Sequence, residues 1–233
     1  MILEVIAISV SDVRDAVRLG ADRIELVTGI AEGGLTPSLG LIEAAVTAAA
    51  SIPVNVMVRP HSQSFCYKED DLGVMVRDIE TIRQTGAAGI VLGTLTSSGG
   101  IHIPALEKLL VAAERLDVTF HRAFDEIQDQ LSALQSIAAY PQISRILTSG
   151  GQAPVPRAIP RLRELNEAAR HTNLRILAGH GLTPDALDEV LKETGVTEVH
   201  FGSAIREDNT FASPISAVKM QHVRKIIDSR SLI

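Results

Sequence analysis

Three ionisable side chains lie close together in the sequence where an apolar run ends, within residues 118–125. His121 could serve as an acid, a base or a ligand, Arg122 could bind a carboxylate or phosphate, and Asp125 could orient either of them. His200, in another apolar run, is a further candidate for the same space. The alternative is a core histidine whose hydrogen bonds are satisfied, beside an aspartate that caps a helix.

Two glutamates lie inside apolar runs, where an unpaired carboxylate costs several kcal/mol. Glu4 must therefore find a cation or hydrogen-bond donors inside the fold. Alternation places Glu25 on the same face as Arg23, and we expect that face to point into the interior. Arg59, at the end of the next run, is a ready counter-ion for these acids. The same charges could instead form a structural layer of ion pairs.

Glycine-rich segments end the last three apolar runs and predict a binding site for an anion. Backbone N–H groups of such loops, together with a helix N-terminus, often bind phosphate in barrel proteins. The alternative is that the glycines only permit tight turns. The residues predicted to bind the anion are Ser149, Gly150, Gly151, Gly179, Gly181, Gly202 and Ser203.

These candidates lie at the ends of eight short apolar runs, each followed by a stretch with helical spacing, and this repeat predicts a single (β/α)8 TIM barrel over residues 1–233. Barrel enzymes carry their chemistry at the C-terminal ends of the strands. A doubly wound sheet is the competing architecture, but no Gly-x-Gly-x-x-Gly opens a first helix. The expected strands are 2–9, 23–28, 54–60, 89–96, 118–125, 145–151, 175–181 and 198–203. The expected helices are 11–19, 38–50, 70–85, 104–115, 129–139, 156–170, 184–194 and 217–229.

The composition of the 233 residues, 45% hydrophobic and 21% charged, is sufficient for a large core. A net charge of -6 and the lack of a basic cluster with interleaved aromatic residues argue against a nucleic-acid partner. No apolar run is long enough to span a membrane, and charged residues interrupt the N-terminal run before a signal peptide could form. The single cysteine, Cys66, fits a reducing compartment. We therefore expect a cytoplasmic protein whose partner is a small anionic molecule, with neither nucleic acid nor membrane involved.

Several motifs resemble those of the CutC copper homeostasis family, in order from Glu4 to about His200. The resemblance implies a cytosolic barrel, commonly a dimer or higher homo-oligomer, that is associated by name with copper. It also implies an active-site-like cluster of unknown reaction at Glu25, Arg59, His121, Arg122, Asp125 and His200. The motifs are Ala-Asp-Arg-Ile-Glu-Leu at 21–26, Glu-Gly-Gly-Leu-Thr-Pro-Ser at 32–38, Met-Val-Arg-Pro at 57–60, Phe-His-Arg-Ala-Phe-Asp at 120–125 and Ile-Leu-Thr-Ser-Gly-Gly at 146–151.

Departures from the family pattern concern copper directly. Family members often carry cysteines in the first and second strands, which have been considered as copper ligands, but this chain has Ile6 and Val27 there. His61 and Cys66 are the remaining metal candidates, and a loop of that length need not bring them together. A further difference is that residues 179–181 are Gly-His-Gly, where family members have Gly-Gly-Gly.

Two classes of function follow. The first is an enzyme that acts on a small anionic substrate, with phosphorylated compounds among the candidates. It would use acid–base chemistry, with Glu25 or His121 as the base and Arg59 and Arg122 binding the anion. The second is a copper-binding or copper-trafficking protein without catalysis. Imine chemistry is not expected, because no expected strand contains a lysine and only Lys68 lies on a loop at the catalytic end.

Overall fold

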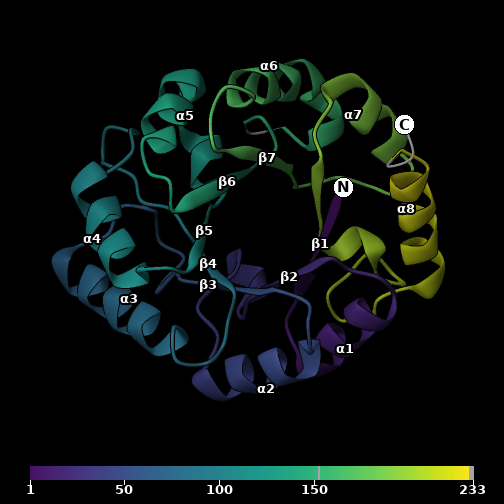
Figure 1. Cartoon of the computed structure of the whole chain (residues 1–233), viewed down its shortest axis with the longest axis horizontal. Helices are drawn as coiled ribbons and strands as arrows, with labels where there is room; N and C mark the ends of the chain where they lie inside the picture. Colours follow the sequence, from purple (N-terminus) through teal and green to yellow (C-terminus); the bar gives the residue numbers. More distant parts are fainter. Residues whose placement is uncertain (152, 231–233) are drawn as a thin grey trace.

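Eight parallel strands close into a barrel in which each strand pairs with the next and β1 pairs with β8. The computed structural model describes residues 1–151 and 153–230. The helices form a ring around the strands, as Figure 1 shows, so the expected (β/α)8 barrel is confirmed. The strands are β1 (Ile2–Ala7), β2 (Arg23–Leu26), β3 (Val54–Met57), β4 (Gly89–Leu92), β5 (Asp117–Phe120), β6 (Ile143–Thr148), β7 (Arg175–Ala178) and β8 (Glu198–Phe201). The helices are α1 (Val10–Arg18), α2 (Leu39–Ala49), α3 (Glu69–Ile82), α4 (Ile103–Ala113), α5 (Gln130–Ala138), α6 (Ile159–Ala169), α7 (Leu187–Thr194) and α8 (Ala217–Arg230).

The local sequence explains where the helices begin and end. Ser9 and Ser38 accept hydrogen bonds from the backbone N–H groups of Asp12 and Leu41, which caps the first turns of α1 and α2. Gly195 ends α7 in a left-handed conformation, with φ at 67°, which glycine adopts without steric cost. The outward faces of the strands pack against the apolar faces of the helices, so most of the core lies between strands and helices.

The strands are shorter than the apolar runs predicted. β3 ends at Met57 and β5 ends at Phe120, so Arg59 and His121 lie in the loops just beyond them. The backbone N–H of Arg59 donates to the side chain of Thr36 at 2.9 Å instead of continuing a strand ladder. The chemically interesting residues therefore lie in the loops above the barrel, which is the end where barrel enzymes place their sites.

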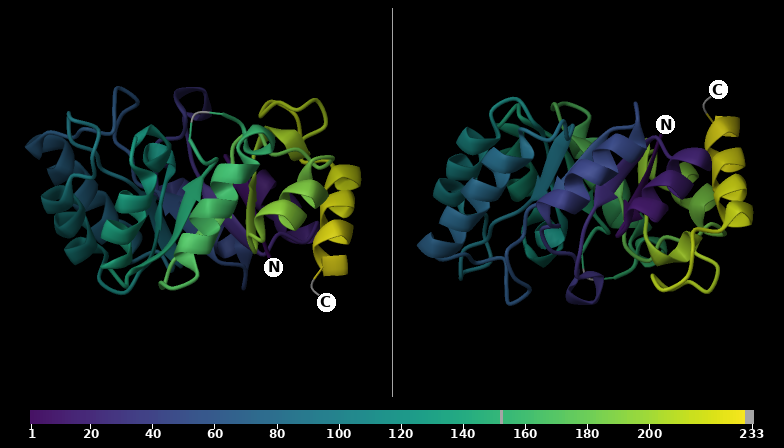
Figure 2. Two further views of the ribbon diagram at one scale, coloured as in Figure 1. Left: turned by 90° about the horizontal axis from the view of Figure 1, so that it is seen from above. Right: turned by 90° about the horizontal axis from the view of Figure 1, so that it is seen from below.

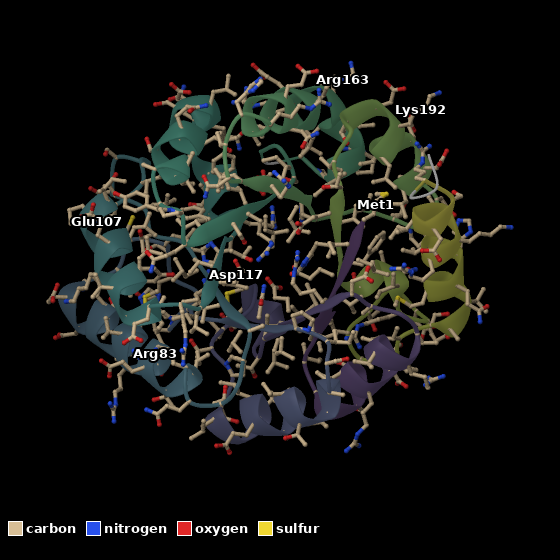
Figure 3. The ribbon with its side chains drawn as sticks, viewed as in Figure 1. Met1, Arg83, Glu107, Asp117, Arg163 and Lys192 are labelled. Atoms are coloured by element: carbon tan, nitrogen blue, oxygen red, sulfur yellow. The ribbon has the colours of Figure 1, made fainter. Side chains whose placement is uncertain are left out.

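Two of these loops rise from the same rim of the barrel. Figure 2 shows the β2–α2 loop, in purple, and the β8–α8 loop, in yellow, projecting on the same side in both views. Figure 3 shows Arg163 and Lys192 pointing outward from the helix ring, whereas Asp117 lies inside it. Among the described residues, no helix is both long and apolar enough to cross a membrane.

Candidate active site

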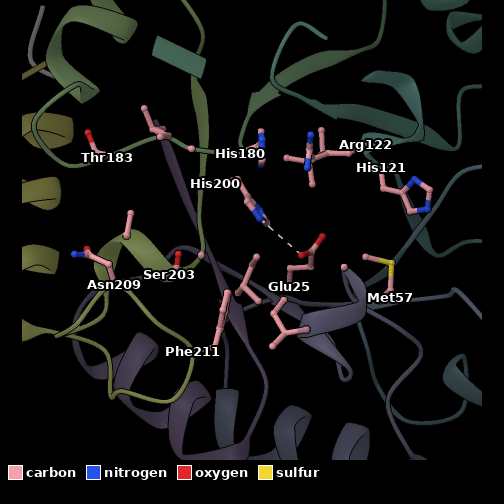
Figure 4. Close-up of a pocket in the computed structure, with 18 of the residues that line it drawn as sticks. Glu25, Met57, His121, Arg122, His180, Thr183, His200, Ser203, Asn209 and Phe211 are labelled. Atoms are coloured by element: carbon pink, nitrogen blue, oxygen red, sulfur yellow. Dashed lines mark ion pairs between the residues drawn. The ribbon is translucent and has the colours of Figure 1, made fainter. Parts of the chain in front are cut away.

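A cavity of about 1110 Å³ opens at the C-terminal end of the strands. It is large enough for a small metabolite, and its walls mix apolar and ionisable side chains. Figure 4 shows Glu25, His121, Arg122 and His200 arranged around it. Of the predicted catalytic and anion-binding residues, those that line the cavity are Glu25, Arg59, His121, Arg122, His200, Gly181, Gly202 and Ser203.

The floor of the cavity holds a row of three buried ionisable groups. The Nδ1 atom of His200 lies 2.7 Å from Oε1 of Glu4, and its Nε2 atom lies 3.8 Å from Oε2 of Glu25. Glu25 lines the cavity, and its Oε1 atom is buried with no hydrogen-bond partner among the described residues. The imidazole of His200 is thus held by Glu4 on one side and faces a carboxyl group with spare hydrogen-bonding capacity on the other.

The pKa values of the two glutamates shift in opposite directions. Burial, assisted by the charge of Glu4, raises the pKa of Glu25 to about 7, although His200 opposes the shift. Burial also acts on Glu4, but Arg23 and His200 outweigh it and lower the pKa of Glu4 to about 2. For His200, burial lowers the pKa, but Glu25 and Glu4 outweigh burial and the net shift is upward. The Glu25 and His200 pair can therefore gain or lose a proton near neutral pH.

Below the cavity, charged residues form a connected layer inside the barrel. Arg23 donates to Glu4 and to Glu198, the latter at 2.6 Å. Arg145 lies 3.3 Å from Glu198 and 2.5 Å from Asp117. Each of these charged groups has a partner of opposite sign. A structural ion-pair layer therefore includes Glu4, but it is built with Arg23 and not with Arg59.

Arg59 does not take the counter-ion role predicted for it, because Arg23 fills that role for Glu4. The NH1 group of Arg59 donates to the backbone carbonyls of Glu32 at 3.1 Å and Gly34 at 3.3 Å. Its guanidinium carbon lies 4.7 Å from the centre of the Phe65 ring. Among the described residues no carboxylate pairs with it, and its buried Nε atom has no hydrogen-bond partner. Arg59 is therefore a buried cation available to an anion in the cavity.

His121 packs against the same aromatic side chain, with 4.7 Å between its ring centre and that of Phe65. Burial and the nearby charge of Arg59 lower the pKa of His121 to about 3. The ring is therefore neutral at physiological pH but only weakly basic, and the low basicity argues against the role of general base that the sequence left open for it.

Two glycines make room for the two site histidines. A Cβ atom on Gly93 would lie 2.6 Å from Nδ1 of His121. A Cβ atom on Gly179 would lie 3.0 Å from the Cβ of His200 and 2.6 Å from the side chain of Leu147. Gly179 thus serves the packing of His200, a role different from the anion binding predicted for it.

Asp125 occupies the loop that was predicted to bind an anion. Its carboxylate accepts hydrogen bonds from the backbone N–H groups of Ser149 at 3.1 Å and Gly151 at 3.2 Å. Arg122 donates to the same carboxylate at 2.8 Å, and the N–H of Gly150 donates to the Thr148 hydroxyl at 2.8 Å. The backbone N–H donors of residues 149–151 therefore bond groups inside the protein in this structure, and anion binding by this loop stays a prediction. Asp125 joins the β5 and β6 loops and orients Arg122, without lining the cavity itself.

Within the described residues, the group with three possible metal-binding side chains is Glu4, Glu25 and His200. Arg23 already bonds Glu4, which leaves Glu25 and the Nε2 atom of His200 as the ligand atoms not already paired with a cation. Elsewhere, Nε2 of His61 lies 3.4 Å from a carboxylate oxygen of Asp71.

The structure adds site residues that the sequence reasoning missed. Phe65 contacts both Arg59 and His121, but an isolated aromatic residue in a loop gives no such signal. Lys219, on α8, also lines the cavity, so Lys68 is not the lysine nearest the site. Its amino group donates to the carbonyl of Arg206 at 2.5 Å. Only the folded β8–α8 connection brings this lysine to the cavity.

Comparison with known proteins identifies relatives over most of the chain. The model of the CutC family matches residues 1–205. A family protein CutC from Bacteroides fragilis strain YCH46 is 43% identical over 184 residues, which cover 79% of this chain and 72% of the relative. The corresponding protein of Glaesserella parasuis serovar 5 is 34% identical and covers 100% of this chain and 96% of its own length.

Comparison with solved structures also finds a CutC protein. The crystal structure of CutC from Streptococcus agalactiae, named for copper homeostasis, superposes with a TM-score of 0.81 at 33% identity and covers 87% of this chain and 98% of that one. Thiamine phosphate pyrophosphorylase from Pyrococcus furiosus has a TM-score of 0.66 at 18% identity, covers 98% and 96% of the two chains, and is alike in fold alone. The chain therefore belongs to the CutC family.

Proposed function

We propose that this CutC-family protein is an enzyme that moves a proton on a small anionic substrate held in the barrel cavity. The observation that carries the proposal is the buried pair of Glu25 and His200, 3.8 Å apart, facing the cavity. A general base works best when its pKa lies near the working pH, and burial raises the pKa of Glu25 to about 7. Glu25 is the base in this scheme, and His200 shares its proton.

The anionic character of the substrate follows from Arg59. Its charge is buried beside the cavity and has no acidic partner among the described residues. Arg122 adds positive charge to the same cavity but shares it with Asp125. Because Asp125 already occupies the donors of residues 149–151, the proposal specifies an anion bound at Arg59 and leaves open whether it is a carboxylate or a phosphate.

Titration calorimetry with pyruvate, glycolate, inorganic phosphate and glycerol phosphate tests this proposal. At least one of these anions should bind, and Arg59→Met should weaken its binding by about tenfold or more, as expected for loss of a charge-assisted contact. Arg163→Met, which removes an exposed arginine paired with Glu193, is the matched control and should bind as the wild type does. Proton uptake measured in two buffers should depend on Glu25 and disappear in Glu25→Gln. Equal binding by both arginine variants, or no binding of any of the four anions, would contradict the proposal.

Copper handling is the second candidate. It is supported by the family membership, because the Streptococcus agalactiae relative is named for copper homeostasis. Tight Cu(I) sites use two or three converging soft ligands, and Cys66 is the only thiol of the chain. Ile6 and Val27 belong to one apolar cluster with Met57 at the cavity wall. We therefore expect weak Cu(I) binding. Competition with a Cu(I) chelator, on wild type and on Cys66→Ser, checks this, and tight stoichiometric binding that Cys66→Ser abolishes would favour copper handling.

A further inference from the structure

We infer that the reaction is the removal of a proton from a carbon next to a carbonyl group, with His121 donating to the carbonyl oxygen and Glu25 acting as the base. This inference rests on the proposed function and adds its reaction class and the chemical class of its substrate. The substrate would be a small carbonyl compound that also carries a carboxylate or a phosphate.

The hydrogen bonds of His121 fix which ring nitrogen carries its proton. The backbone N–H of Ala123 donates to Nδ1 of His121 at 3.2 Å, so Nδ1 accepts and the proton of the neutral ring lies on Nε2. This Nε2–H group is buried and has no partner among the described residues, although His121 lines the cavity. A buried donor left without a partner costs about 1 to 3 kcal/mol. An acceptor oxygen on a ligand would remove that cost.

Arg59 and His121 lie on one wall, because Phe65 packs against both of them. The Nε atom of Arg59 is also buried without a partner among the described residues. One wall of the cavity therefore contains a neutral imidazole and a guanidinium group, each with a buried N–H that has no partner among the described residues. Preorganised donors of this kind stabilise the negative charge that develops on a carbonyl oxygen. Since the positive charge of Arg59 helps to hold the pKa of His121 at about 3, the imidazole donates as a neutral group.

The proposed step balances without a cofactor. The carboxylate of Glu25 takes the proton from the carbon next to the carbonyl, and the electron pair of the broken C–H bond forms a C=C bond. The π electrons of the carbonyl move to its oxygen, which accepts a hydrogen bond from Nε2–H of His121 and is further stabilised by Arg59. Return of a proton from Glu25 to the same carbon re-forms the carbonyl compound and completes an exchange of that hydrogen.

Acyl transfer fits the site less well, because it needs a nucleophile activated by a neighbouring base. Ser203 is the serine that lines the cavity, and the described contacts include no hydrogen bond between it and Glu25 or His200. The groups that the cavity does present are a base and oxyanion donors, which are the requirements of enolisation.

Hydrogen–deuterium exchange into carbonyl probes tests the inference. The protein is incubated in D2O with pyruvate, hydroxypyruvate and dihydroxyacetone phosphate, and loss of the C–H signal is followed by proton NMR. The two oxo acids and the phosphorylated ketone distinguish a carboxylate from a phosphate as the anion. We expect exchange above the buffer rate with at least one probe, reduced about 100-fold in His121→Phe, as for loss of one oxyanion donor. His171→Phe, which replaces an exposed histidine, should behave as the wild type does.

A second measurement uses the wild-type protein, so it does not require that a variant folds. Nitrogen-15 NMR of labelled histidine should show His121 as a neutral ring protonated on Nε2 throughout pH 5 to 8. Exchange that His121→Phe leaves unchanged, or a His121 ring that is charged or protonated on Nδ1, would overturn the inference. Anion binding at Arg59 without exchange into any probe would overturn it as well but would leave the proposed function standing. If neither anion binding nor exchange were observed, both this inference and the proposed function would be contradicted.

Discussion

The barrel interior contains two layers of buried charge that differ in how completely their groups are paired. In the lower layer, Arg23 bonds both Glu4 and Glu198, and each charge lies within ion-pair distance of an opposite charge, although Nε of Arg145 makes no hydrogen bond within the described part of the chain. In the cavity layer, Glu25 and Arg59 each keep a buried polar atom without a partner in the described structure. A buried charge alone therefore does not mark a functional site in a barrel. The unpartnered atom beside a cavity is the informative observation.

Breaking the lower layer should have the largest effect on stability. Arg23→Met would leave Glu4 and Glu198 buried without their cation. We expect the free energy of unfolding to fall by about 3 to 5 kcal/mol, because the remaining carboxylates have lost their compensation. Urea unfolding followed by circular dichroism measures this.

The matched change in the cavity layer is Arg59→Met. Arg59 has no carboxylate partner among the described residues but donates to two backbone carbonyls, so its removal should lower the free energy of unfolding by about 1 to 2 kcal/mol, less than Arg23→Met does. Equal losses from the two arginine variants would show that the two layers do not differ as described.

A loss smaller than that of Arg23→Met is expected from Asp125→Asn, which removes the charge that links the β5 and β6 loops. The carboxylate accepts from Ser149 and Gly151 and pairs with Arg122. We expect a loss of about 2 kcal/mol in the free energy of unfolding, typical of a hydrogen bond to a charged group. Asp129→Asn is the control, since asparagine caps a helix as well as aspartate does and Asp129 caps α5. A loss no larger than that of the control would mean that the charge of Asp125 contributes nothing to the loop.

The sequence predicts the barrel well because its signals are local. Apolar runs and capped amphipathic helices recur along the chain, and the structure reproduces them with strand ends a few residues earlier. The partners of the charged residues could not be predicted in the same way. Arg23 and Glu198 are far apart in the chain and meet only when the barrel closes. The same limit explains why Asp125 was not expected among the glycine loop donors, and why Lys219 was not expected at the cavity.

The two glutamates should also give opposite pH dependences of stability. The pKa of Glu25 in the folded protein, about 7, lies above the unfolded value of 4.5, so the folded state binds the proton more tightly. The resulting stability is present below about pH 4.5 and is lost as the pH rises through about 7. Glu4 behaves in the opposite way, because its pKa of about 2 makes its stability present above pH 4.5 and lost as the pH falls toward 2.

Comparing wild type with Glu25→Gln isolates the first of these effects. From pH 5 to pH 8 the wild type should lose stability relative to the variant, as followed by urea unfolding at fixed ionic strength. The rise in the pKa of His200 depends largely on Glu25, so the variant should also lose part of the histidine contribution. Glu43→Gln, on the outer surface, controls for removal of a carboxylate. A stability difference between wild type and Glu25→Gln that does not vary with pH would contradict the assignment.

A carbon-13 NMR titration of the glutamate carboxyl groups tests the base at the cavity most directly, with Glu4→Gln and Glu25→Gln used to assign the two signals. Glu25, beside His200, should titrate with a midpoint near 7, while Glu4 should stay ionised down to about pH 3 because its pKa is about 2. A Glu25 signal that titrates near 4.5, the ordinary value for a glutamate, would contradict the claim that the cavity holds a base tuned to neutral pH.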